Sequence, residues 1–221
     1  MIPLLEMKNV SFFSKESPII KKLSISVKKG SVVTFIGDSG AGKTTSLKLL
    51  AGILTPFQGE VLFNGTNISN FTPQENKAFR KKTAFVFQNS ALWQSKTIYT
   101  NLEIPLLVHF PQLSSSIRKR KIEFFANLVN YKKNLELYPS SLSIGEQKKI
   151  AFARALITKP EILFLDECTE SVDYLTRQKM ISILNIFVKQ RKTLIYVSHD
   201  SEFIHAFPGE KYYFKNGNIL H

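Results

Sequence analysis

Hydrophobic and polar residues alternate along some stretches of the chain and follow a helical period along others. Residues 4–13 and 23–28 alternate with a period of two, which predicts two strands, and the polar run Ser14 to Pro18 predicts the turn between them. Residues 31–36 are almost all β-branched or apolar. That composition is typical of a strand with both faces buried, as in a parallel sheet.

A glycine-rich segment follows this buried strand and leads into a helix. Apolar residues recur at helical spacing over residues 44–54, and Pro56 and Gly59 mark the end of that unit. Two short strands are predicted at residues 59–63 and 83–87. Further along, the same rules predict helices at 145–157 and 175–189, strands at 162–165 and 193–197, and a hairpin at Asn216-Gly217 within residues 211–221.

Between residues 88 and 149 the sequence changes to helical segments that are richer in Lys, Ser and Asn. On either side of this region strands alternate with helices. That order predicts an α/β fold whose parallel strands are joined by right-handed crossovers.

The length and composition fit one soluble globular domain. The chain has 221 residues, of which 43% are hydrophobic and 21% are charged. A chain of this size buries a substantial core without disulfides or a structural metal. Cys168 is the single cysteine, so an internal disulfide is excluded, and no Cys/His cluster has the spacing of a zinc site. A reducing compartment is the simplest expectation.

The net charge changes this picture little. Thirty Lys and Arg residues against 17 Asp and Glu residues give a formal charge of +13. Such an excess favours phosphate ligands, acidic partners, anionic lipid surfaces or nucleic acid. The basic residues are mostly scattered in pairs, and only Arg118 to Lys121 forms a tight cluster. We interpret most of the excess as solvated surface.

Nothing in the sequence predicts a membrane span. The N-terminal residues lack a basic region before a long apolar run, so we expect no signal peptide. The most apolar later stretch, residues 104–110, is interrupted by Pro105 and His109 and is far shorter than a transmembrane helix. We therefore expect that the chain does not cross a bilayer by itself.

The glycine-rich segment carries the first chemical motif, a match to the phosphate-loop pattern G-x-x-x-x-G-K-[ST]. Glycines let the backbone wrap closely around phosphate oxygens, and the helix that follows adds its positive N-terminal end. Lys43 is predicted to reach the β- and γ-phosphates of a nucleotide, and the Thr44 hydroxyl is predicted to bind Mg²⁺. The predicted contacts are Gly37, Asp38, Ser39, Gly40, Ala41, Gly42, Lys43, Thr44 and Thr45.

Two carboxylates follow the buried strand predicted at residues 162–165. Asp166 and Glu167 stand at its C-terminal end, where α/β sheets bind their ligands. Asp166 suits a Mg²⁺ site through water, and Glu167 suits a general base that activates the attacking water. On this pattern alone, two solvated acids at a strand end are an equally good interpretation.

Residues 142–156 begin Leu-Ser-Ile-Gly-Glu and end Ala-Arg-Ala-Leu. With this segment the sequence resembles the ABC ATPase family, whose signature is Leu-Ser-Gly-Gly-Gln followed by a helix that ends in Ala-Arg-Ala-Leu. The resemblance covers essentially the whole chain, because all six motifs of the family occur in the family's order. They are the phosphate loop 37–45, Gln88, the signature 142–146, Asp166-Glu167, Asp173 and His199.

The resemblance implies a P-loop NTPase core of the RecA-like type, with a mostly parallel sheet, an N-terminal antiparallel β subdomain and a helical insertion. It implies one ABC ATPase domain over residues 1–221. Within it, residues 1–87 and 158–221 would form the core, and residues 88–157 would form the helical subdomain with the signature. It also implies ATP hydrolysis, with ATP and Mg²⁺ as cofactors.

In this family two subunits hold two ATP molecules head-to-tail. The resemblance therefore implies a partner that is a second copy of the chain or a homologous subunit. Ser143 and the Gly145 backbone would contact the γ-phosphate of the ATP bound by the other subunit. A plain helix N-cap is the alternative role for Ser143, and the two roles are compatible.

Three further residues take their roles from the resemblance. Gln88 would contact Mg²⁺ and the attacking water while linking the core to the helical insertion. His199 would hold the γ-phosphate and position Glu167. Asp173 would lie at the dimer seam.

Three residues depart from the family pattern. Ile144 replaces Gly at the third signature position, and Glu146 replaces Gln at the fifth. A side chain at Ile144 would crowd the dimer interface, or strain the backbone if a positive φ is needed. Cys168 follows Glu167 where Pro is usual, which would loosen the turn before Asp173. No departure removes a catalytic atom, so hydrolysis is still expected.

The residue that stacks on adenine is ambiguous. The family register places Ser14 there, and a serine offers no aromatic face. Phe12 and Phe13 are the nearest substitutes, and we predict Phe13 as the adenine contact.

If transport is the role, a transmembrane permease must be a separate partner. The segment 87–107, which includes Trp93, resembles the region that receives the coupling helix of the membrane subunit in this family. Ordinary packing of the helical insertion is the alternative, since aromatic residues also fill cores. The expected location is the cytoplasmic face of the inner (cell) membrane, held there through the membrane subunit.

Local patterns favour a lipid or lipoprotein substrate. The run from Phe87 to Trp93 and the later Asn101…Pro105 pattern resemble ATPases of phospholipid trafficking in the bacterial envelope. The order S-x-G-E-Q at residues 143–147 resembles ATPases for lipoprotein release, macrolide export and cell division. Residues 138–140 resemble bacterial stand-alone subunits rather than fused exporters.

Two other functions are weighed against transport. An ABC ATPase acting in translation or DNA repair is disfavoured, because the chain has one phosphate loop and only about fifty residues between Gln88 and Leu142. No nucleic-acid partner is therefore expected. A regulatory subunit with little turnover is disfavoured by the presence of Lys43, Glu167 and His199.

Overall fold

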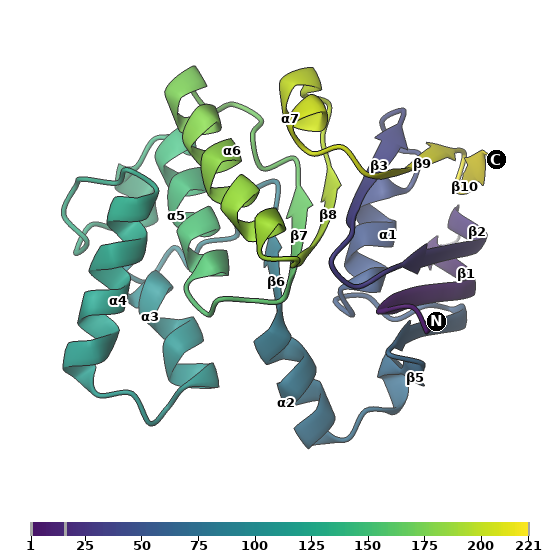
Figure 1. Cartoon of the computed structure of the whole chain (residues 1–221), viewed down its shortest axis with the longest axis horizontal. Coiled ribbons are helices and arrows are strands. Elements are labelled where there is room, and N and C mark those ends of the chain that lie inside the picture. Colours follow the sequence, from purple (N-terminus) through teal and green to yellow (C-terminus); the bar gives the residue numbers. More distant parts are fainter. Residues whose placement is uncertain (1, 16, 221) are drawn as a thin grey trace.

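The computed structural model describes residues 2–15 and 17–220, which form two sheets with helices between and around them (Figure 1). A four-stranded antiparallel sheet has the order β2-β1-β4-β5, and a six-stranded sheet has the order β10-β9-β3-β8-β7-β6. In the six-stranded sheet every pair of neighbours is parallel except the β9–β10 hairpin. The predicted α/β class, with its added antiparallel sheet, is confirmed.

The antiparallel sheet corrects one prediction. Strand β1 continues to Ser14, and β2 begins at Ser17 rather than at residue 23, so the predicted turn at residues 14–18 is too long. The ladder extends this far because Phe12 and Phe13 pair with Ile20 and Pro18. The bounds are Leu5–Ser14 for β1, Ser17–Val27 for β2, Gln58–Phe63 for β4 and Thr66–Asn67 for β5.

The six-stranded sheet agrees with the predicted buried strands. Strands β7 and β8 are buried along their whole length, as expected for central parallel strands. The hairpin predicted at Asn216-Gly217 joins β9 to β10. The bounds are Val32–Gly37 for β3, Thr83–Val86 for β6, Ile162–Asp166 for β7, Thr193–Val197 for β8, Glu210–Lys215 for β9 and Asn218–Leu220 for β10.

The helices predicted from periodicity are present, with small differences at their ends. Helix α1 stops at Leu50 rather than at residue 54, because the chain turns at Gly52, whose φ is +63°. The bounds are Lys43–Leu50 for α1, Pro73–Lys82 for α2, Ile98–His109 for α3, Ser115–Leu128 for α4, Ile144–Leu156 for α5, Tyr174–Lys189 for α6 and Ser201–Ala206 for α7. Short 3₁₀ turns occupy Ile68–Asn70 and Pro139–Ser141.

Two helices have no counterpart among the predictions. Helix α2 begins at a capping box in which the Thr72 hydroxyl accepts from the Glu75 backbone and the Glu75 carboxylate accepts from the Thr72 backbone. The Thr-Pro-Gln-Glu pattern at residues 72–75 is a sequence signal for the start of a helix. Helix α7 is a short helix capped by Asp200. It is too short to show the periodic pattern of apolar residues by which helices are predicted.

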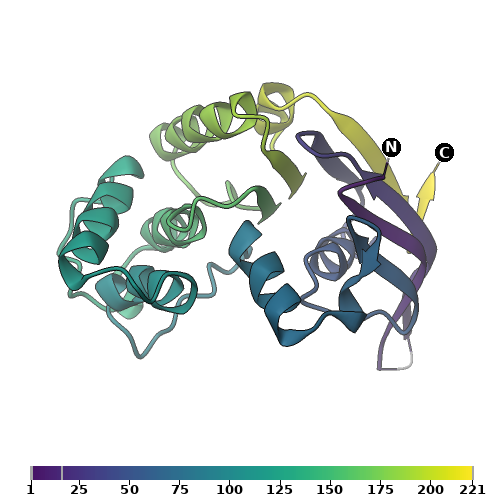
Figure 2. The same cartoon turned by 60° about the horizontal axis from the view of Figure 1, so that its bottom comes forward.

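Two hydrophobic cores hold these layers together. The first lies around α1, whose Leu47 and Leu50 pack with Met7 of β1 and Phe35 of β3, so α1 fills the space between the two sheets. The second joins α5 and α6 to the other face of the six-stranded sheet and extends into α3 and α4. Figure 2 shows the helices α3–α5 grouped on one side of the molecule and the sheets on the other. The division into residues 88–157 and the remainder stays a prediction.

Candidate functional site

Three parallel strands end side by side, and each is followed by a predicted site residue. Strand β3 ends at Gly37, β7 at Asp166 and β8 at Val197, and β8 pairs with both of the others. The carboxyl ends of parallel strands are where α/β sheets bind ligands. A cavity of about 500 Å³ opens there. It is lined by Ile19, Ser39, Gly40, Gly42, Lys43, Thr44, Thr45, Gln88, Glu167, Glu170, Val197 and His199.

The phosphate loop depends on two glycines for its close packing. Gly37 has a φ of +145°, and a Cβ there would lie 2.2 Å from the Phe214 carbonyl oxygen. Gly42 has a φ of +100°, and a Cβ there would lie 2.5 Å from Ile20 Cδ1. Gly42 is also the N-cap of α1 and offers no side-chain cap. The first N–H groups of α1 are therefore directed at the cavity with no side chain to occupy them.

Lys43 is folded back across its own loop. Its Nζ donates to the carbonyl oxygens of Gly37 and Asp38, both at 2.7 Å. Burial lowers the pKa of Lys43, although the negative charges of Glu167, Asp38 and Asp166 oppose that shift. The ammonium is thus held at the centre of the loop, where it is available to an anion.

Thr44 and Asp166 meet as the sequence predicts. The Thr44 hydroxyl donates to Asp166 Oδ1 at 2.7 Å, and Asp166 is only 1% exposed. Burial raises the pKa of Asp166, while the hydrogen bond from Thr44 lowers it. A buried carboxylate beside a hydroxyl is a pair of hard oxygen donors, which is the donor type that Mg²⁺ prefers. These two residues therefore fit one side of a Mg²⁺ site.

Glu167 and His199 form a pair at the rim of the same cavity. His199 Nε2 lies 3.3 Å from Glu167 Oε1, and the His199 backbone N–H donates to Glu167 Oε2 at 3.2 Å. Glu167 has a φ of +48°, which is unusual for a residue with a side chain. Strained backbone of this kind concentrates at functional sites. The geometry fixes the Glu167 carboxylate and leaves 13% of the side chain exposed.

Burial raises the pKa of Glu167, while the charge and the backbone N–H of His199 lower it. If Glu167 is the base, turnover is lost as pH falls through this raised pKa, because the protonated acid cannot accept a proton. We expect the acid limb of the kcat profile to lie above the ordinary glutamate value of 4.5. Steady-state ATP turnover between pH 4.5 and 8 measures it.

A variant at Glu170 should shift the acid limb in the opposite direction, to lower pH. The charge of Glu170 raises the pKa of Glu167, so Glu170→Gln should move the acid limb to lower pH. A limb at the ordinary glutamate value in both proteins would mean that another group controls the profile.

Gln88 reaches the cavity from the segment after β6. Its Nε2 donates to Glu170 Oε2 at 3.0 Å, and the buried Lys148 lies 3.9 Å from the same carboxylate. Lys148 also donates to the Glu167 carbonyl oxygen at 3.2 Å. Glu170 and Lys148 were not among the predicted residues. The sequence feature that could have placed Glu170 in the site is its acidic side chain only four residues after Asp166.

The signature residues lie elsewhere in the chain. Ser143 and Gly145 do not line the cavity; they begin α5, where Ser143 is the N-cap predicted as its alternative role. Asp173 likewise caps α6 and accepts from the Thr176 backbone at 2.8 Å and the Thr176 hydroxyl at 2.6 Å. Within one chain, therefore, the phosphate loop and the signature form separate surfaces.

The departures from the family pattern are accommodated within the chain. Ile144 is the first residue of α5 and does not have a positive φ, and its side chain is 64% exposed. Cys168 is buried in the core, and burial raises the pKa of its thiol to about 12. The thiol is therefore unreactive and serves as a packed core side chain. Asp173 still caps the N-terminus of α6.

The placement of Phe13 does not support its predicted contact with adenine. Phe13 packs edge-on against Phe57, with ring centroids 5.1 Å apart, and is absent from the lining of the phosphate-loop cavity. Ile19 lines the cavity instead, because β2 begins earlier than predicted and carries Ile19 next to Gly42. Ser14 ends β1 opposite Ser17.

Comparison with protein families and curated proteins gives concordant matches. The family model described as "ABC transporter" matches residues 20–170. ABC transporter ATP-binding protein YtrE of Bacillus subtilis is 34% identical over 189 residues, which are 85% of this chain and 81% of that protein. Methionine import ATP-binding protein MetN 1 of Enterococcus faecalis is 31% identical over 98% of this chain, and the match spans 62% of that protein. Spermidine/putrescine import ATP-binding protein PotA of Thermotoga maritima is 34% identical over 87% of this chain, and the match spans 51% of that protein.

Solved structures share the whole architecture. The ATP-binding cassette MJ0796, in a dimeric post-hydrolysis state bound to ADP and Pi, superposes with a TM-score of 0.89 at 28% identity. The match covers 98% of this chain and 97% of that chain. CbiO1 from Clostridium perfringens, part of a CbiONQ transporter complex, has a TM-score of 0.79 at 21% identity and supports the fold alone.

Proposed function

The chain belongs to the ABC transporter family as an ATP-hydrolysing cassette, and we propose that it drives a membrane transporter from a head-to-tail pair of such cassettes. The observation that carries this proposal is one cavity lined by the phosphate loop and the Glu167–His199 pair, with Thr44 in its wall hydrogen-bonded to the buried Asp166. Each of these groups has a distinct role in phosphoryl transfer to water.

The phosphate loop and Lys43 bind the ATP phosphates. The N–H groups at the start of α1 surround the phosphates, and Lys43 transfers its hydrogen bonds from the Gly37 and Asp38 carbonyl oxygens to phosphate oxygens. A phosphate is the better acceptor because it is charged. Thr44 and Asp166 would hold Mg²⁺, which neutralises charge on the phosphates when it is bound.

Glu167 is the general base of the reaction. His199 holds its carboxylate from two directions, through the ring and through the backbone N–H. A water between the carboxylate and the γ-phosphate loses its proton to Glu167 as it attacks. Gln88, held by Glu170, faces the same space and orients that water.

A second copy of the chain completes the site. Ser143 and Gly145 lie at the N-terminus of α5, outside the phosphate-loop cavity. A helix N-terminus binds anions, so in a two-fold dimer this surface would cover the γ-phosphate held by the partner. The dimeric state of MJ0796 supports this arrangement.

Mixing two inactive variants tests the head-to-tail arrangement. Lys43→Met removes the phosphate-loop lysine, and Gly145→Asp places a negative charge where the partner's γ-phosphate would lie. We expect each variant alone to be inactive, and an equal mixture to recover about a quarter of wild-type ATP turnover. Half of the dimers are mixed, and each mixed dimer contains one intact composite site.

Gly145→Asp is suited to this test because the single chain tolerates it. A Cβ at Gly145 would meet nothing closer than the Ser171 carbonyl oxygen at 3.8 Å, and an acid in the first helical turn is stabilising. A mixture that stays inactive, although gel filtration shows mixed dimers, would exclude a site shared between subunits. Activity of Gly145→Asp alone would exclude the signature from catalysis.

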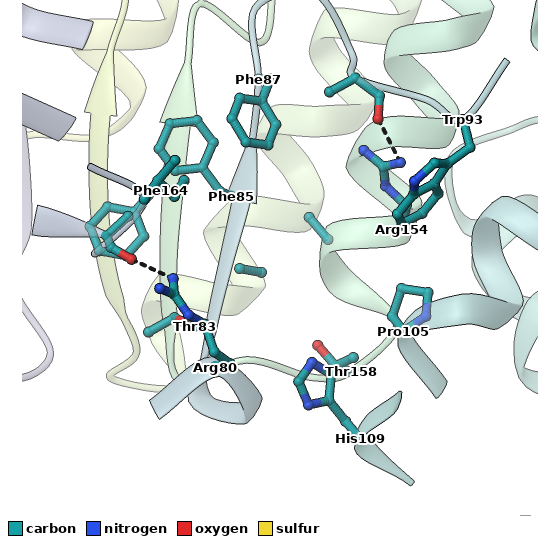
Figure 3. A pocket seen from close by; sticks show the side chains of 15 residues that line it. Arg80, Thr83, Phe85, Phe87, Trp93, Pro105, His109, Arg154, Thr158 and Phe164 are labelled. Carbon is teal, nitrogen blue, oxygen red and sulfur yellow. Dashed lines mark hydrogen bonds between the residues drawn. The ribbon is translucent and has the colours of Figure 1, made fainter. Parts of the chain in front are cut away.

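The membrane subunit is proposed to dock in a second cavity of about 440 Å³ between α2, α3, β6 and α5 (Figure 3). Trp93 lies at one side of this cavity and is 45% exposed. The Arg154 guanidinium stacks 4.9 Å from the Trp93 ring centroid and donates to the Ser90 and Ala91 carbonyl oxygens at 2.9 Å. This network fixes Trp93 beside the segment that carries Gln88, so a protein bound to Trp93 would sense the ATP site.

The electrostatics of this docking cavity favour a partner segment with apolar side chains and a carboxylate. Its lining contains Arg80, Arg154 and His109 and, among the described residues, no acid. In the described part of the chain no helix has the length and hydrophobicity of a membrane span. We propose a peripheral location at the cytoplasmic face of the inner membrane, through a separate transmembrane permease.

The transported substrate is a separate question. The names of the relatives state methionine import and spermidine/putrescine import, and none of those cited names a lipid. The lipid or lipoprotein substrate predicted from the sequence therefore gains no support from them. The proposal is a transport ATPase whose permease sets the substrate.

A further inference from the structure

The N-terminus of α5 carries an ion pair that the proposed reaction does not use. Glu146 Oε2 accepts from the Ser143 backbone N–H at 3.0 Å and lies 3.1 Å from the Ser143 hydroxyl. The Glu146 backbone N–H donates to the Ser143 hydroxyl at 3.3 Å. On its other side, Glu146 lies 2.9 Å from Lys133 Nζ through Oε1 and 3.0 Å through Oε2.

This geometry conflicts with a phosphate contact at Ser143. A serine hydroxyl has one proton, and here that proton points to the Glu146 carboxylate. To donate to a phosphate, the hydroxyl must release Glu146. The Glu146 charge would also repel the phosphate across the same short distance. The family residue at this position, glutamine, carries no such charge.

Lys133 is placed to reduce both effects. It reaches Glu146 from the loop between α4 and α5, outside the helix. The hydrogen bond from Lys133 is the largest cause of the lowered pKa of Glu146, followed by burial, which opposes it. Lys133 therefore keeps Glu146 ionised but paired, and it competes with Ser143 for the carboxylate oxygens.

We propose that Lys133 is a positioning residue for the ATP bound by the partner subunit, because its charge offsets that of Glu146 and makes the carboxylate a weaker acceptor, so that the Ser143 hydroxyl can turn from Glu146 to the γ-phosphate. The inference rests on the proposed head-to-tail function. It makes the Lys133–Glu146 pair the element that sets how much ATP is needed to close the dimer. A purely structural cap at α5 would need no cation on Glu146.

The test uses the Glu167→Gln background, which is expected to retain bound ATP, and measures the ATP concentration at half-maximal dimerisation. Lys133→Met should raise that concentration about two- to fivefold, since Glu146 is left unpaired. Glu146→Gln should lower it below the parent value. Lys133→Met combined with Glu146→Gln should equal Glu146→Gln alone, because no charge remains to neutralise.

Lys132→Met is the matched control, since Lys132 is the exposed neighbour of Lys133 and makes no ion pair with Glu146. Lys133→Arg should restore the parent value. Nucleotide binding to the single chain should be the same in all variants, because Lys133 lies outside the phosphate-loop cavity.

Two results overturn the inference. Either Lys133→Met behaves like Lys132→Met, or it costs as much in the Glu146→Gln protein as in the parent, which would indicate a general structural role. Failure of the proposed function has a different signature. In that case neither Glu167→Gln nor its Glu146→Gln derivative forms a dimer at any ATP concentration.

Discussion

Glu167→Gln is expected to lower ATP turnover by about 10²–10⁴-fold, the range usual for the loss of a general base. The amide has the shape of the carboxylate and still accepts from the His199 backbone N–H, which is 3.2 Å from Glu167 Oε2 in the wild type. The site should therefore keep its geometry and its affinity for Mg-ATP. Phosphate release and nucleotide binding, measured on the same preparation, separate the two effects.

The same variant is expected to accumulate as an ATP-bound dimer. Hydrolysis would open the dimer, so a chain that binds ATP without hydrolysing it should shift from monomer to dimer in gel filtration when Mg-ATP is added. Glu161→Gln is the control, because the Glu161 side chain is exposed and does not line the cavity. Near-wild-type turnover in Glu167→Gln would remove Glu167 from the role of base.

Much of the fold could be predicted because its signals are local. Strand β8 has the predicted bounds, Thr193–Val197. A short apolar run between polar residues is typical of a buried strand. Helix α5 begins directly after Ser143, which forms with Glu146 a capping box that can be recognised from the sequence. The hairpin at Asn216-Gly217 follows from the positive φ of both residues, +50° and +80°.

The errors arose where tertiary packing decides. The turn predicted at residues 14–18 is too long, because pairing of Phe13 with Pro18 and of Ser14 with Ser17 extends the β1–β2 ladder. Polar turn-forming residues remain in a strand when the neighbouring strand supplies hydrogen bonds. Helix α2 was missed although its capping box was visible, since few apolar residues follow Thr72 to form a periodic face.

The site was predictable to the extent that its residues belong to motifs. Lys43, Thr44, Asp166 and Glu167 were predicted from short patterns and His199 from the family resemblance, and the strand order brings them together. The missing partners come from elements with no motif of their own. They are Ile19 from β2, Glu170 and Lys148, and Lys133 at the signature. Contacts between residues 13 to 82 positions apart depend on the folded chain, which short motifs do not specify.

Lys43→Met is expected to abolish ATP binding, with affinity lowered at least about 100-fold. Lys43 is the cation held inside the phosphate loop, 2.7 Å from two loop carbonyl oxygens. Without it, the phosphates lose a charged hydrogen-bond donor at the centre of the cavity. Lys48→Met is the control, since Lys48 is on the same helix but does not line the cavity.

Although Lys43→Met should lose ATP affinity, it should not lose stability in the absence of ligand. Burial lowers the pKa of Lys43 below its unfolded value, so at neutral pH the folded chain bears the cost of a charged, buried amine. Methionine removes that cost, and the ligand-free variant should unfold at or slightly above the wild-type temperature. Mg-ATP should raise the unfolding temperature of the wild type and Lys48→Met but leave Lys43→Met unchanged. A Lys43→Met chain stabilised by Mg-ATP to the wild-type extent would mean that the phosphates bind outside this loop.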